Sequence, residues 1–158
     1  MGRFIECCCT SLYEAMEAQA GGARRVELCT DLSCGGVTPP LEMIREVSDS
    51  LSIKVNVLIR PRGGDFVYTE DEVQKTLQSI RDCKQIGVNG VVIGALLPDG
   101  DVDMPTMRRL IKEARPLEVT FHRAFDVCRD PMKAFDDVVS LGCDRLLTSG
   151  HEASAYEG

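Results

Sequence analysis

Hydrophobic residues follow two alternating spacings along the chain. Short, mostly apolar runs predict buried strands at residues 3–9, 25–30, 54–60, 90–96, 118–123 and 145–148. Between these runs, apolar residues recur every three or four positions, which predicts amphipathic helices. In the stretch after Thr69, for example, Val73, Leu77 and Ile80 share one helical face. The sequence therefore predicts a repeated unit of one strand followed by one helix.

Cap residues and glycines support this division. Ser11 and Thr69 each precede a glutamate by three positions, which is the spacing of a capping box. Asp130 and Pro131 suit the N-cap and first position of a helix. Strict strand–helix alternation predicts a parallel sheet, either a TIM-type (β/α) barrel or a doubly wound sheet. The dinucleotide-binding version of the second fold is disfavoured, because no Gly-x-Gly-x-x-Gly follows the first strand.

Polar residues gather near the carboxyl ends of the expected strands. They are Glu6, Cys8, Glu27, Cys29, Arg60, His122, Arg123, Thr148 and Ser149. In a barrel, these ends form the rim that carries function. The stretch at 60–66, Arg-Pro-Arg-Gly-Gly-Asp-Phe, is the most distinctive part of this rim. Its arginines suit carboxylate or phosphate groups, and its glycines allow a ligand to approach the backbone.

Two kinds of site are predicted at this rim. Arg60, Arg62, Asp65 and Arg123, with Thr148 and Ser149, form the expected binding set for a small anionic ligand. Four further groups form a candidate acid–base set, namely Glu6, Glu27, His122 and Asp126. The alternative for both sets is structural, with a tight turn at 60–66 and an ion-pair network across the barrel mouth.

Composition and charge narrow the classes of partner. The 158-residue chain has a net charge of −7, which disfavours nucleic acid and anionic membrane surfaces as partners. No apolar run approaches the roughly 18 residues that span a bilayer. Eight cysteines without a secretion signal are typical of free thiols in a reducing compartment. We therefore expect a cytoplasmic protein.

Several segments, in order along nearly the whole chain, carry a recognisable set of motifs. They are Glu6-x-Cys8 and the residues at 26–29, 35–39, 59–66, 94–96, 120–126 and 147–150. Together they resemble the CutC family of copper homeostasis proteins. The resemblance implies a cytoplasmic TIM-type barrel that forms homo-oligomers. In this family, two cysteines near the ends of the first two strands have been proposed as Cu(I) ligands, and they match Cys8 and Cys29.

The length of the chain departs from the family pattern. A TIM barrel takes about 250 residues, and family members carry two further strands. We therefore expect residues 1–158 to form a single (β/α) barrel domain that lacks the last two β/α units, with about six of eight strands present. Two functions stay open. The first is Cu(I) binding in copper homeostasis, and the second is an enzyme acting on a small anionic substrate, with copper incidental.

Overall fold

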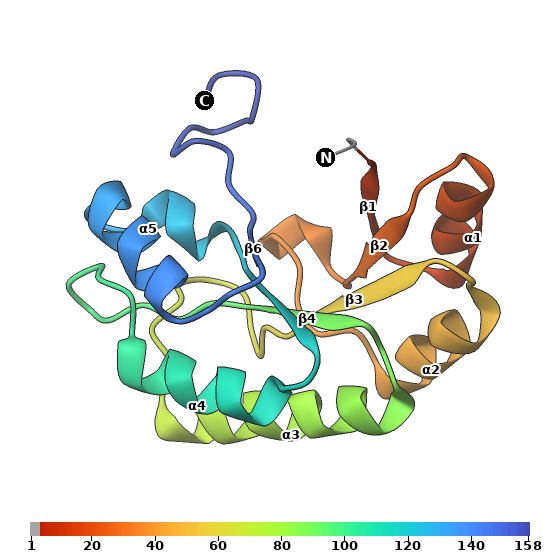
Figure 1. Ribbon diagram of the computed structural model, residues 1–158, viewed down its shortest axis with the longest axis horizontal. Coiled ribbons are helices and arrows are strands. Elements are labelled where there is room, and N and C mark those ends of the chain that lie inside the picture. The colour runs from red at the N-terminus through yellow and green to blue at the C-terminus, as the bar shows by residue number, and fades with distance from the viewer. Residues whose placement is uncertain (1–3) are drawn as a thin grey trace.

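A curved parallel sheet with helices along its outer face forms the molecule in the computed structural model, which describes residues 4–158 (Figure 1). The elements follow in the order β1 (Glu6–Cys9), α1 (Leu12–Ala20), β2 (Arg25–Leu28), η1 (Leu32–Cys34), α2 (Leu41–Ser50), β3 (Lys54–Leu58), α3 (Glu70–Ile86), β4 (Gly90–Ile93), α4 (Met104–Ala114), β5 (Glu118–Phe121), η2 (Arg123–Val127), α5 (Pro131–Ser140) and β6 (Arg145–Leu146). Arg3, which the sequence assigns to the first strand, lies outside the described residues.

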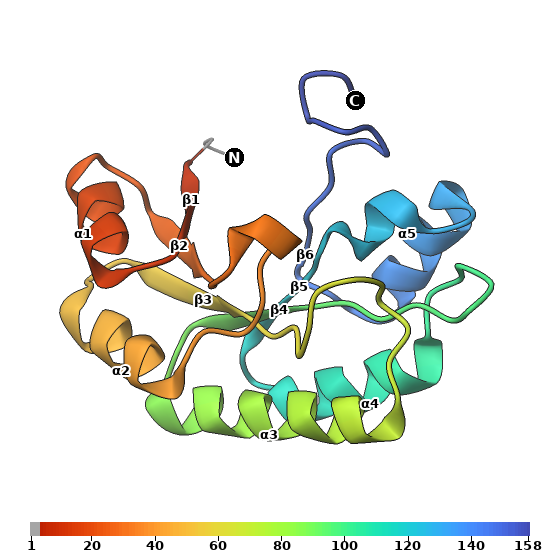
Figure 2. The same cartoon turned by 180° about the vertical axis from the view of Figure 1, so that it is seen from behind.

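The strand order confirms the predicted fold class. Neighbouring strands follow chain order from β1 to β6, and every neighbouring pair is parallel. The six strands and the helices between them form an incomplete TIM-type barrel. The view from behind shows β1 and the C-terminal segment after β6 on the side where the curved sheet stays open (Figure 2).

The strands from β2 to β6 end earlier than the sequence predicts, because their carboxyl ends turn toward loops, whereas β1 ends where expected, at Cys9. Arg60, for instance, follows β3 and its carbonyl accepts hydrogen bonds from the backbone and hydroxyl of Thr38. The predicted helix starts are present. Thr69 and Glu72 form a full capping box, and the Asp130 side chain caps α5. Ser11 caps α1, but the Glu14 carboxylate bonds to Thr10 instead of completing the box.

Two apolar clusters fix the positions of the strands. The main cluster lies between the sheet and its helices and includes the fully buried Val57, Val91 and Ile80. Each such side chain contributes about 1.5–3 kcal/mol by leaving water. A small second cluster, made of Cys29, Leu58 and Val92, is separate from the main core. In strands of period two, Leu58 and Arg60 share a face, so this second cluster lies on the face that carries the polar rim.

The two outer strands each have one hydrogen-bonded neighbour in the described part of the chain. β1 pairs with β2, and β6 pairs with β5. Apolar side chains are exposed next to these edges, at Phe4, Ile5 and Leu147. Unpaired strand edges of this kind are templates for further strand pairing. Within residues 4–158, no helix combines the length and the apolar content needed to cross a membrane.

Candidate functional site

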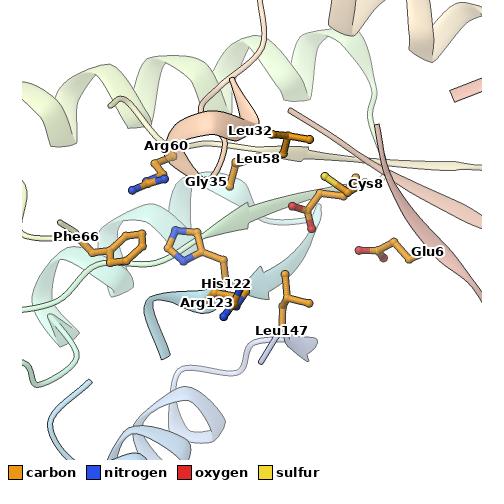
Figure 3. A pocket seen from close by; sticks show the side chains of 11 residues that line it. Glu6, Cys8, Leu32, Gly35, Leu58, Arg60, Phe66, His122, Arg123 and Leu147 are labelled. Carbon is orange, nitrogen blue, oxygen red and sulfur yellow. The ribbon is translucent and has the colours of Figure 1, made fainter. Parts of the chain in front are cut away.

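A cavity of about 430 Å³ lies at the carboxyl ends of the strands (Figure 3). It is lined by Glu6, Cys8, Glu27, Leu32, Gly35, Leu58, Arg60, Phe66, His122, Arg123 and Leu147. Cavities of this size hold small organic ligands. The residues come from strands far apart in sequence, and they meet because parallel strands end at the same edge of the sheet.

Two thiols meet at the edge of this cavity. Cys8 lies opposite Glu27 in the β1–β2 ladder, so Cys29, two residues further along, shares the face of Cys8. The Cys8 and Cys29 Sγ atoms are 3.4 Å apart. A hydrogen bond from Cys29 lowers the pKa of Cys8 to about 7, and the same bond raises the pKa of Cys29. Cys8 is exposed whereas Cys29 is buried, so the pair is reachable through Cys8.

The two carboxyl groups of the cavity have different surroundings. Glu6 forms an ion pair with Arg25, whose guanidinium lies 4.8 Å from the centre of the Phe4 ring. Glu27 is buried and has no salt-bridge partner among the described residues. Burial, together with the nearby charges of Cys8 and Glu6, raises the pKa of Glu27 to about 8. Glu6 is therefore held by a cation, whereas Glu27 keeps its proton at neutral pH.

Arg60 and His122 form the opposite end of the cavity, where Figure 3 shows them beside Phe66. The Phe66 ring centre lies 4.7 Å from Cζ of Arg60 and 5.0 Å from the centre of the imidazole ring. The Ala124 N–H donates to Nδ1 of His122. Burial, followed by the charge of Arg60, lowers the pKa of His122 to about 3. The imidazole is therefore neutral, with its proton on Nε2.

Asp126 lies next to the cavity and organises the segment after β6. Its carboxylate accepts hydrogen bonds from Arg123, from the Thr148 hydroxyl and from the backbone and hydroxyl of Ser149. Burial opposes ionisation, but these bonds and one from the His151 N–H lower the pKa of Asp126. Of this group, Arg123 lines the cavity, whereas Asp126, Thr148 and Ser149 hold Arg123 and the turn from behind.

Arg62 and Asp65 do not line this cavity. Arg62 bonds to Glu72 in the first turn of α3, at 2.5 Å, and to Asp65 at 3.0 Å. Its guanidinium also lies 5.3 Å from the ring centre of Tyr68. The hydrogen bond from Arg62 lowers the pKa of Asp65. Arg62 therefore has the paired geometry of the structural alternative, whereas Arg60 on the same stretch does not.

The apolar lining of the cavity was not singled out from the sequence. Leu32, Gly35, Leu58, Phe66 and Leu147 all contribute to it. The signal for Leu58 was strand parity, because it precedes the rim residue Arg60 by two positions. Phe66 ends the arginine and glycine stretch at 60–66, and Gly35 begins the family segment at 35–39, so both residues lie within distinctive segments of the sequence.

The donor set limits which metals the cavity could hold. Among residues 4–158, no three His, Cys, Asp or Glu side chains cluster as a metal site. A ligand set at the cavity edge would therefore consist of the two sulfurs of Cys8 and Cys29. Structural zinc sites take four ligands, whereas Cu(I) is a soft ion that favours thiolates. The two-sulfur set fits Cu(I) better than it fits zinc.

Comparisons with known proteins place these residues in a family. The profile of the CutC family matches residues 3–158. A CutC family protein from Parabacteroides distasonis is 55% identical over 159 residues, which cover 100% of this chain and 65% of that protein. One from Bacteroides thetaiotaomicron is 48% identical over 155 residues, covering 98% and 62%. The chain thus spans less than two thirds of the length of these curated relatives.

Solved structures agree with the fold. A crystal structure from Streptococcus agalactiae, of a protein assigned to copper homeostasis as CutC, has a TM-score of 0.90 at 32% sequence identity. That match covers 96% of this chain and 75% of the other. An aldolase has a TM-score of 0.63 at 16% identity, covering 99% of this chain and 74% of the other. The second likeness shows only that the barrel architecture is shared.

Proposed function

The chain belongs to the CutC family, and we propose that it acts in copper homeostasis by binding Cu(I) between Cys8 and Cys29. The observation that carries this proposal is the 3.4 Å distance between the two sulfurs. Both thiols come from neighbouring strands and face the same way, so one ion can contact both with little movement of the backbone. Copper is the cargo of this function, and the exposed Cys8 gives it a route in and out.

The chemistry of the pair supports a reversible site. A thiolate must form before it binds a metal, so binding releases protons and depends on pH. The two-sulfur ligand set leaves Cu(I) accessible to an incoming thiol, which would remove it by exchange. The proposal includes a cytoplasmic location, which the eight free cysteines support, since a reducing compartment keeps thiols unpaired. It also includes assembly into homo-oligomers, as the family resemblance implies.

Anaerobic titration of Cu(I) against a competing chelator tests this function. The double variant Cys8→Ser, Cys29→Ser should bind Cu(I) at least about 100-fold more weakly than wild type, because it lacks both sulfur ligands. A matched control, Cys34→Ser with Cys143→Ser, removes two half-buried thiols elsewhere and should keep the wild-type affinity. Equal affinity in all three proteins would place copper on unspecific thiols and refute the proposal.

A second candidate function is an enzyme that acts on a small anionic substrate, with copper incidental. The observation that favours it is the Arg60–His122 end of the cavity, since copper transfer requires neither residue. In this candidate, Glu6 and Glu27 supply carboxyl groups for proton transfer, and His122 donates a hydrogen bond from Nε2. Asp126 acts through Arg123, which it positions at the cavity wall.

Activity screening on a full-length relative tests this candidate, with small carboxylates and sugar phosphates as substrates. Turnover that survives the double substitution Cys8→Ser, Cys29→Ser would separate catalysis from copper. Absence of turnover on every substrate, in a protein that still binds Cu(I), would count against the enzyme and for the copper function.

A further inference from the structure

Arg60 carries a buried positive charge that has no counterion among residues 4–158. The residue is 5% exposed, and its guanidinium donates to the backbone carbonyls of Cys34 and Gly36 from Nη1 and to that of Gly64 from Nη2. All three acceptors are neutral. No carboxylate of residues 4–158 lies within salt-bridge distance of it, although buried cations are normally paired.

Donors of this guanidinium remain free. Arginine has five N–H donors, and three are used by the carbonyls, which leaves the Nε–H and one on Nη2. Nε is buried and has no hydrogen-bond partner in the described part of the chain. A buried, unpaired donor on a charged group costs free energy, so the arrangement favours an acceptor that arrives from outside.

His122 presents a second unpaired donor at the same end of the cavity. Because Nδ1 accepts the Ala124 N–H, the proton of the neutral ring lies on Nε2. Nε2 is buried, and no described residue forms a hydrogen bond with it. The Phe66 ring packs against both side chains, so Arg60 and His122 lie against one aromatic ring.

The charges around the cavity favour a ligand with one negative charge. Arg123 also lines the cavity, but Asp126 neutralises it. Arg25 is paired with Glu6. Arg60 is thus the cation at the cavity wall whose charge no described carboxylate offsets. Cys8 and Glu27 lie at the other end of the cavity, where Glu27 keeps its proton at neutral pH. Leu32, Leu58 and Leu147 make much of the remaining wall apolar, and attraction between charges is stronger in such surroundings.

We propose that the Arg60–His122 end of the cavity binds a short monocarboxylate that carries a hydroxyl or carbonyl oxygen beside the carboxylate. The guanidinium meets the carboxylate, since its fork of donors matches that group. The His122 Nε2–H donates to the neighbouring oxygen. A phosphate dianion fits less well, because one of its charges would stay unpaired in an apolar cavity. The inference rests on the second candidate function and deepens it by naming the class of ligand.

Histidine NMR on the metal-free protein tests this inference. The chain has two histidines, so ¹⁵N labelling of histidine gives a simple spectrum in which His122 can be followed. Lactate, a 2-hydroxy monocarboxylate, should shift the His122 Nε2–H signal in a saturable way at millimolar concentration. Lactamide, its neutral isostere, and inorganic phosphate should both bind at least about tenfold more weakly, which corresponds to about 1.4 kcal/mol.

Variants test the role of the Arg60 charge. Arg60→Gln should abolish the shift caused by lactate. Arg109→Gln is the control, because it removes a positive charge that is paired with Glu70 outside the cavity, and it should change the affinity less than about threefold. Should Arg60→Gln fail to fold, the comparison of lactate with lactamide on the wild-type protein decides the question.

The outcomes distinguish this inference from the function on which it rests. Lactate binding with no turnover of any carboxylate supports the inference and counts against the enzyme. Turnover of a phosphate ester without lactate binding overturns the inference and leaves the enzyme standing. Equal shifts with lactate and lactamide, tighter binding of phosphate, or no shift with lactate would each overturn it.

Discussion

Replacing His122 by asparagine should change how stability depends on pH. His122 is buried between Phe66 and Phe121, and its folded-state pKa is about 3 against an ordinary value of 6.5. Below pH 6.5 the unfolded chain takes up a proton on this residue, whereas the folded chain does not. The contribution of His122 to the free energy of unfolding is therefore complete above pH 6.5 and is lost as the pH falls toward 3.

The size of this effect follows from the two pKa values. Proton linkage gives a slope of about 1.4 kcal/mol per pH unit between them. From pH 7 to pH 4.5 the loss amounts to about 2.5 kcal/mol. In His122→Asn the residue no longer titrates, and the asparagine oxygen can still accept the Ala124 N–H at the start of η2. Loss of the ring lowers the stability of the variant by a constant amount that does not depend on pH.

Urea unfolding of both proteins at half-unit steps from pH 7 to pH 4.5 measures this effect. The difference in free energy between wild type and His122→Asn should shrink by about 2.5 kcal/mol over the range, because every other group titrates in both proteins. Two parallel curves, or a His122 resonance that titrates near pH 6.5, would show that the imidazole accepts a proton in the folded state.

Three further predictions follow from contacts described above. Gly94→Ala places a Cβ 2.6 Å from Cε1 of His122, so urea unfolding should show a loss of about 1–3 kcal/mol that shrinks in the His122→Asn background. Asp126→Asn should speed amide hydrogen exchange at Ser149, because the Ser149 N–H loses its carboxylate acceptor, and unchanged exchange would contradict this role of Asp126. The variant should also be less stable at neutral pH, and the difference from wild type should disappear only in acid, where Asp126 of wild type becomes protonated, because its pKa lies below the ordinary value. The 158-residue chain should associate through its sheet edges in sedimentation experiments, and Ile5→Lys should reduce this; a monomer with a reversible transition would contradict it.

Most of the fold was predictable because alternation of strands and helices leaves few parallel topologies. The proximity of Cys8 and Cys29 was also predictable from the sequence, since alternation along a strand decides which side chains face the barrel interior. The lengths of the strands were harder to predict from the sequence. Arg60, for example, continues the sequence pattern of its strand, but its backbone N–H bonds to Thr38 in a loop instead of to a neighbouring strand. The sequence pattern does not show whether a backbone group bonds to a strand or to a loop.

The roles of the charged groups could not be predicted, because they depend on contacts between distant segments. Arg60 and Arg62 are two positions apart, yet one faces neutral carbonyls and the other pairs with Glu72 on α3. The hydrogen bond from the Ser149 N–H to the Asp126 carboxylate likewise joins η2 to the turn after β6. Only a structure shows which cation is already neutralised and which is free to meet a ligand.

Three consecutive cysteines in β1 make the position of a thiol robust to errors in strand pairing. Shifting a strand by one residue exchanges its two faces, so Cys8 would leave the cavity while Cys7 and Cys9 entered it. A slipped edge strand would thus still offer sulfur to an incoming soft ion. It would, however, turn Glu6 away from Arg25, leaving that buried guanidinium without its partner. The ion pair of Glu6 with Arg25 therefore favours the correct register of β1, whereas a cysteine faces the cavity in either register.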